Sequence, residues 1–280
     1  MRAALTRDRW GDLKVMDRNT STLVEHLKQV SRNDIGRATT IDLQPIFLNH
    51  TMNTALEFLG LRDGQYKPMS AYVGTKDFPG AFEFAQVVMI RRTLLGAFYW
   101  LYNTKAFKEA CDVCRSAVGK SVSVALERTE NIQNEDEAVQ ANNFLDELAL
   151  QTRDTDRLTS MALDMMLASR DTSAAAMSFL IYYLARHPES FASLRKATFE
   201  HFGQSSTAEN MTFEKLKSCQ YLQWCIHETL RLRPSTPFGI KKAVRDTTLP
   251  KGGGPDGMSP IFVAKVCIAE SLCAKCLTTS

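Results

Sequence analysis

The chain has 280 residues, of which 44% are hydrophobic and 23% are charged, so it is long and apolar enough to bury a sizeable core. Its net charge is only +3, from 34 basic and 31 acidic residues that are scattered along the chain, which argues against nucleic-acid binding. The odd cysteine count, a charged N-terminus and the lack of a long uncharged apolar run predict a soluble chain in a reducing compartment, without a secretory leader or a membrane span.

The first half of the chain has helical periodicity. Apolar residues recur at helical spacing over residues 13–30, and Asp42 is a candidate N-cap for a second helix. Glycines and prolines make residues 61–80 a predicted loop. A long apolar segment covers residues 82–126, and the acidic, amide-rich residues 129–142 predict a solvated connector.

A long helix is predicted from Asp156 to Arg186. Its middle, residues 161–185, is apolar almost all round, which predicts a helix buried on every side. The His187-Pro188 pair ends this helix, because proline cannot donate a hydrogen bond and disfavours a helical predecessor.

Two more helices and a small sheet are predicted to complete the chain. One helix starts at Pro188 and ends at Gly203, and a single helix covers residues 213–232. After Pro234 the chain consists of proline, glycine and short β-prone pieces. The fold class is therefore mainly α, with a small β portion near the C-terminus.

Asp171 and Thr172 carry the first chemical signal. They place an ionisable group and a hydroxyl midway along an apolar helix, where such groups are costly unless they have partners or a purpose. One interpretation is a proton relay, in which an acid and an alcohol deliver protons to an oxygen species beside the helix. The alternative is structural: Thr172 bonds to the carbonyl of Ala168, and Asp171 pairs with a base. Taken alone, the two residues favour the structural alternative.

Glu228 and Arg231 carry the second signal. They stand three residues apart on a predicted helix and so share a face, but such pairs are common. The order along the chain is more specific. The helix with Asp171 and Thr172 is followed by Leu-Ala-Arg-His-Pro-Glu and then by Glu-x-x-Arg-Leu-x-Pro, which ends at Pro234.

This order resembles the second half of the cytochrome P450 fold, the fold of the heme-thiolate monooxygenases. Residues 243–257 and 260–263 resemble the fungal branch that hydroxylates alkanes and fatty acids. The similarity keeps one register over roughly residues 2–265. The resemblance implies a partial cytochrome P450 domain in residues 1–265, truncated at both ends.

The resemblance also implies an activity and partners. The reaction is the insertion of one oxygen atom from dioxygen into a C–H bond of a long apolar substrate. It uses heme and electrons from an NADPH-dependent reductase. The family is expected at the endoplasmic reticulum membrane, but no anchor is seen in this sequence, so the chain as written is predicted to be cytoplasmic.

Site residues follow from the resemblance, position by position. Asp171 and Thr172 match the acid and the alcohol that protonate iron-bound dioxygen. Glu228 and Arg231 match an ion pair that supports the heme pocket.

Four further residues match cofactor contacts. Lys241 stands where the family usually places an arginine against a heme propionate, with an ordinary solvated lysine as the alternative. Arg2 matches a second propionate contact, although for it an ordinary surface role is favoured. Ala168 and Ser169 border the expected oxygen-binding groove, and Ser169 replaces a glycine, which narrows the gap.

The heme-ligand motif of the family is not found in this sequence. The family places the cysteine that ligates the iron in Phe-x-x-Gly-x-Arg-x-Cys-x-Gly, and none of the seven cysteines has a glycine two positions later. Two Cys-x-x-Cys pairs are interpreted as free thiols, so no metal site is predicted. Residues 266–280 match nothing in the family and are predicted to be a disordered tail. The chain as written is therefore predicted to be inactive. The alternative is a non-catalytic helical remnant that binds a partner or an apolar ligand.

Overall fold

A computed structural model describes residues 13–33, 41–61, 77–130, 143–203, 211–236, 238–265 and 268–272. The described helices are α2 (Lys14–Asn33), α3 (Leu43–Phe58), α4 (Phe78–Leu94), the 3₁₀ helix η1 (Gly96–Leu101), α5 (Lys105–Glu130), α7 (Phe144–Gln151), α8 (Thr155–Arg186), α9 (Pro188–Phe202), α10 (Phe213–Ser218) and α11 (Gln220–Leu232). The described strands are β1 (Phe238–Lys242), β2 (Thr247–Gly253), β3 (Ser259–Val263) and β4 (Ile268–Leu272). The mainly α fold class is confirmed.

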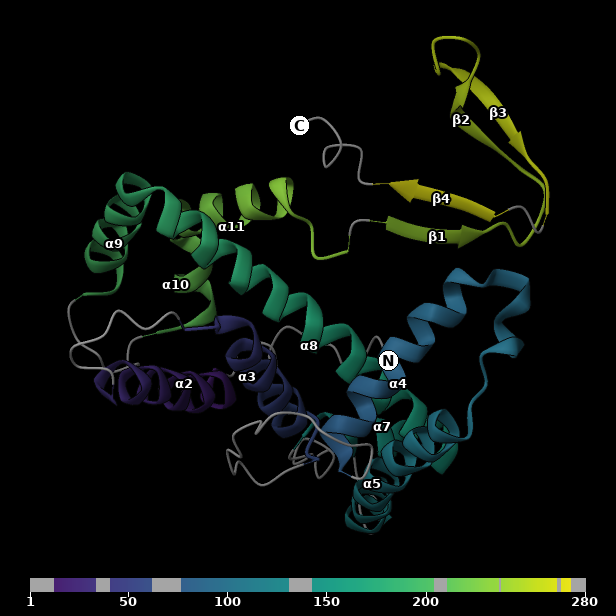
Figure 1. The fold of residues 1–280 in the computed structure, drawn as a ribbon, viewed down its shortest axis with the longest axis horizontal. Coiled ribbons are helices and arrows are strands. Elements are labelled where there is room, and N and C mark those ends of the chain that lie inside the picture. The colour runs from purple at the N-terminus through teal and green to yellow at the C-terminus, as the bar shows by residue number, and fades with distance from the viewer. Residues whose placement is uncertain are drawn as a thin grey trace.

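Helix α8 is the central helix of the fold and contacts α3, α5, α7, α9 and α11. It runs between α9, α10 and α11 at one end and α4, α5 and α7 at the other (Figure 1). The Asp154 side chain caps its first turn by accepting a hydrogen bond from the backbone N–H of Arg157. At the other end, Pro188 opens α9, whose C-cap Gly203 has a φ of 85°, a conformation that favours glycine. The predicted bounds of both helices are confirmed to within a residue.

The main core forms where α3, α4, α5, α7 and the first half of α8 meet. On α5 the buried side chains recur every three or four residues, which gives the helix one apolar stripe. They are Phe107, Ala110, Cys114, Val118, Val122, Ala125 and Thr129. Phe144 of α7 stacks on Phe58 at 5.7 Å between ring centroids. A smaller cluster joins α2, α3 and α8 through Leu23, Phe47 and Ala174.

The prediction that α8 is buried on every side is wrong. Only a stripe is buried, at Leu158, Thr159, Ala162, Met166, Arg170, Ala174 and Leu184. Leu167, Phe179, Ile181 and Tyr182 are exposed, at 37–51% of their surface. Helices pack against α8 along part of its circumference, so the remaining apolar side chains face outward. An apolar sequence shows that a helix can be buried, but burial also requires other helices that pack against each of its faces.

Three further predictions need correction. The single helix expected over residues 213–232 is two helices, because the backbone of buried Cys219 has a ψ of 86° and leaves the α conformation. Within the predicted disordered tail, Ile268–Leu272 form strand β4, paired antiparallel with β1. The connector predicted for residues 129–142 begins later, because α5 continues to Glu130. The loop predicted for residues 61–80 ends earlier, because α4 starts at Phe78.

In the part of the chain that the structure describes, the β portion consists of two antiparallel pairs, β1 with β4 and β2 with β3, and it extends from the end of α11 away from the helices (Figure 1). The β2–β3 hairpin is almost wholly exposed. Among the described residues, no helix combines the length and the apolar character that a bilayer crossing requires.

Candidate functional site

Asp171 lies at the contact between α8 and α4. Its Oδ2 accepts a hydrogen bond of 2.9 Å from Nε2 of Gln86 on α4. Its Oδ1 lies 3.6 Å from Nε of Arg170, and the side chain is 45% exposed. The carboxylate therefore has a base and an amide as partners, as the structural alternative requires.

Arg170 is the buried centre of this contact, and the sequence analysis did not single it out. Its side chain is 0% exposed. Its guanidinium pairs with Glu83 and donates a 3.1 Å hydrogen bond from Nη1 to Oε1 of Gln86. It also lies 5.8 Å from the ring centroid of Phe82. The signal that could have found it is its position in the buried stripe of α8, four residues after Met166 and four before Ala174.

Thr172 is held by its own helix and by the segment that follows α11. Its hydroxyl donates a 2.7 Å hydrogen bond to the carbonyl of Ala168. Its own carbonyl accepts a 2.9 Å bond from the hydroxyl of Ser235. The acid and the alcohol thus have separate partners: Asp171 is bonded to α4, and Thr172 to the preceding turn of α8.

The environment of Asp171 raises the pKa of its carboxyl. Desolvation by burial is the main cause, and the charge of Glu83 adds to it. The positive charge of Arg170 and the hydrogen bond from Gln86 oppose the rise. One cation against two carboxylates leaves the cluster with an excess negative charge.

We expect Asp171→Asn to flatten the pH dependence of stability. A carboxyl whose pKa is higher in the folded chain binds its proton more tightly there, so the free energy of unfolding falls as pH rises between the unfolded and folded pKa values. Asparagine does not titrate, so the fall in the free energy of unfolding caused by Asp171 disappears, and the charge of Arg170 is still neutralised by Glu83. Urea unfolding measured between about pH 4 and about pH 8 should show that the variant is at least as stable as the wild type at neutral pH. A variant that is less stable at neutral pH and keeps the wild-type slope would contradict this expectation.

Ser169 lies beside a cavity between α2, α3 and α8, with a volume of about 320 Å³. Its hydroxyl does not project freely into this space, because it donates a 2.8 Å bond to the carbonyl of Met165. The hydroxyls of Thr51 and Thr54 are likewise bonded to backbone carbonyls of α3. The side chains of Met165, Met177 and Phe58 also line the cavity, so its walls are mainly apolar.

Glu228 and Arg231 form the pair expected from their spacing. Nε and Nη2 of Arg231 donate to the two carboxylate oxygens of Glu228 at 2.7 and 2.6 Å. These hydrogen bonds lower the pKa of Glu228. Both side chains are about half exposed, so this local pair contributes little stability as it stands.

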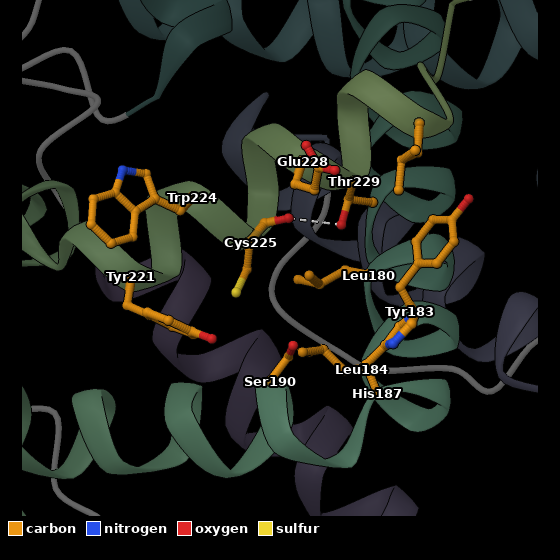
Figure 2. A pocket seen from close by; sticks show the side chains of 11 residues that line it. Leu180, Tyr183, Leu184, His187, Ser190, Tyr221, Trp224, Cys225, Glu228 and Thr229 are labelled. Carbon is orange, nitrogen blue, oxygen red and sulfur yellow. Dashed lines mark hydrogen bonds between the residues drawn. The ribbon is translucent and has the colours of Figure 1, made fainter. Parts of the chain in front are cut away.

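Glu228 also borders a second cavity, of about 360 Å³, between α8, α9 and α11. Figure 2 shows Tyr221, Trp224 and Cys225 of α11 on one side of this cavity and Tyr183 and His187 on the other.

Comparisons with known proteins fix the family. The sequence model described as Cytochrome P450 matches residues 3–253. The chain belongs to the cytochrome P450 family. "Cytochrome P450 52A5" of Candida maltosa is 36% identical over 277 residues, covering 95% of this chain and 51% of that protein. "Cytochrome P450 52A13" of Debaryomyces hansenii is 35% identical over 279 residues, covering 95% and 52%.

The solved structures agree on the fold. A crystal structure of a cytochrome P450, CYP102L1, superposes with a TM-score of 0.73 at 19% identity, covering 98% of this chain and 59% of that one. This chain spans about half the length of the curated cytochrome P450 relatives that it matches. The family prediction is confirmed.

The other predicted cofactor contacts are placed only in part. Lys241 lies in β1, opposite Ala269 of β4, and its side chain is outside the described residues. Arg2 lies outside the described residues altogether. Ala168 is exposed on α8, next to exposed Leu167. Neither propionate contact is tested by this structure.

The heme of this family needs a thiolate on its iron, and the surroundings of Cys111, Cys114 and Cys225 do not favour one. Cys114 is buried in the core, and burial raises its pKa to about 11. Burial also raises the pKa of Cys111 and Cys225 above the ordinary value. Since the thiolate is the ligand form, burial disfavours the ionised form of these three cysteines.

Proposed function

We propose that this chain is part of a cytochrome P450 monooxygenase that hydroxylates a long apolar substrate, such as an alkane or a fatty acid. The observation that carries the proposal is the match to "Cytochrome P450 52A" relatives over 95% of the chain. Dioxygen supplies the inserted oxygen atom, and an NADPH-dependent reductase supplies the electrons. The whole protein would act at the endoplasmic reticulum membrane.

Within that function, Asp171 is the acid and Thr172 the alcohol of proton delivery. Their place on α8 supports this, because Asp171 is partly exposed and its raised pKa favours a bound proton. Glu228 and Arg231 support the pocket from α11. Lys241 and Arg2 contact the propionates, and Ala168 and Ser169 border the oxygen-binding groove.

The chain by itself, we further propose, does not form thiolate-ligated heme and is inactive. The lack of a Cys-x-Gly sequence supports this, and so does the raised pKa of buried Cys114. A second candidate function is a non-catalytic helical protein that binds a partner or an apolar ligand. The apolar cavity between α2, α3 and α8 favours it.

Two preparations test these statements. The purified chain, expressed with heme precursor, should give no carbon-monoxide difference spectrum of a thiolate-ligated heme; a normal spectrum would refute the inactivity. The second preparation is a chimera, in which residues 3–253 of this chain replace the matching portion of the relative "Cytochrome P450 52A5". It should bind heme and hydroxylate a fatty acid with the reductase. A chimera that binds heme and dioxygen but hydroxylates neither alkanes nor fatty acids would favour the second candidate function.

A further inference from the structure

Both polar atoms of the Gln86 side chain form hydrogen bonds across the contact between α4 and α8. The amide is 6% exposed. Its Oε1 accepts from Arg170, and its Nε2 donates to Asp171. An amide with an acceptor bond on one end and a donor bond on the other cannot flip without losing both. Gln86 therefore has one orientation, and its N–H group is aimed at one carboxylate oxygen.

Arg170 holds the other side of the same carboxylate. Its Nε is buried without a hydrogen-bond partner, and it lies 3.6 Å from Oδ1 of Asp171. Buried donors without partners are rare, and each one needs an explanation. The explanation here is that Nε is an electrostatic neighbour of the carboxylate, close enough to become its donor after a small shift. Glu83 binds Nη2 of the same guanidinium, and Gln86 accepts from Nη1, so the two partners on α4 hold the group in place.

We propose that Gln86 and Arg170 are positioning residues for Asp171, which hold its carboxylate toward α4 and away from the Thr172 hydroxyl. The inference rests on the proposed function in that it takes Asp171 as the acid of the reaction. The Thr172 hydroxyl is bonded to the carbonyl of Ala168 and the Asp171 carboxylate to Gln86, so each group has a partner other than its neighbour.

The charged groups that act on Asp171 are Arg170 on its own helix and Glu83 on α4. These groups act on the charge of the carboxylate, so each of them should leave a mark on its titration. Removing the donor from the charged carboxylate should raise the midpoint of its titration, and removing the like charge of Glu83 should lower it. Two neighbours in one cluster should thus shift the same group in opposite directions.

The test is a carbon-13 NMR titration of the Asp171 carboxyl in the full chain, with the resonance assigned by its loss in Asp171→Asn. Gln86→Leu should shift the midpoint up, and Glu83→Gln should shift it down. Asp156→Asn, at an exposed aspartate near the start of α8, is the matched control and should leave it unchanged. Glu83 is 42% exposed, so its variant remains readable if Gln86→Leu fails to fold.

Unchanged midpoints in the folded Gln86 and Glu83 variants would overturn the positioning role. In the chimera, the pH profile of hydroxylation should move in the same two directions, and a fixed profile would also overturn it. An inactive parent chimera would count against the proposed function alone, because the NMR titration needs neither heme nor turnover.

Discussion

Arg170→Met is expected to lower the free energy of unfolding of the chain by about 3 kcal/mol. Removing one partner of a buried ion pair costs about 3–5 kcal/mol. The arginine side chain is 0% exposed, and its loss leaves Glu83 and Asp171 without their common cation. It also leaves Oε1 of buried Gln86 without its donor. Because both carboxylates are partly exposed, water can replace part of what they lose. We therefore expect the lower end of the range.

Arg157→Met is the matched control, since Arg157 is an exposed arginine on the same helix. Its side chain takes no part in the cap, which uses its backbone N–H, so we expect a change within about 0.5 kcal/mol. Urea unfolding followed by circular dichroism gives both values. If the two variants are equally stable, the cluster around Arg170 is not a structural centre. A double variant with Glu83→Gln should lose less than the sum of the single losses, because the two side chains are partners.

The limits of α8 and α9 could be predicted because local residues set them. Asp154 caps α8 with a bond that spans three residues, and Pro188 stops it by its own geometry. The break at Cys219 was missed, since no proline or glycine marks it; the backbone turns at a buried cysteine. Burial of α8 was overestimated for a related reason. Hydrophobicity is a property of the segment, whereas burial depends on which helices lie against it.

The same distinction applies to the candidate site. The bond from Thr172 to Ala168 was open to prediction, because it connects residues four apart on one helix. The partners of Asp171 were not, since Gln86 and Glu83 precede it by more than eighty residues on another helix. Arg170 could have been found from the sequence. Its spacing from Met166 and Ala174 places it in the buried stripe, where a charge requires a counter-charge.

Asp171→Asn in the chimera is expected to slow fatty-acid hydroxylation about 100-fold, the lower end of what a positioned general acid contributes. Asparagine keeps the shape of the side chain and can still accept the bond from Gln86, but it cannot hold or release a proton. The measurement is the rate of product formation at saturating substrate and reductase. The heme spectrum serves as the check that the site is assembled. Asp156→Asn in the same chimera should retain the parent rate.

The two effects expected of this one substitution distinguish catalysis from structure. If the Asp171 carboxylate served only stability, removing it should lower the free energy of unfolding. Its raised pKa indicates the opposite, because the ionised form is less favourable in the folded chain than in the unfolded chain. If Asp171→Asn leaves the chain as stable or more stable and yet slows the chimera, the carboxylate is retained for its proton, at the expense of stability. If the variant hydroxylates at the parent rate, Asp171 is only a partner of Arg170, and proton delivery must be assigned to another group.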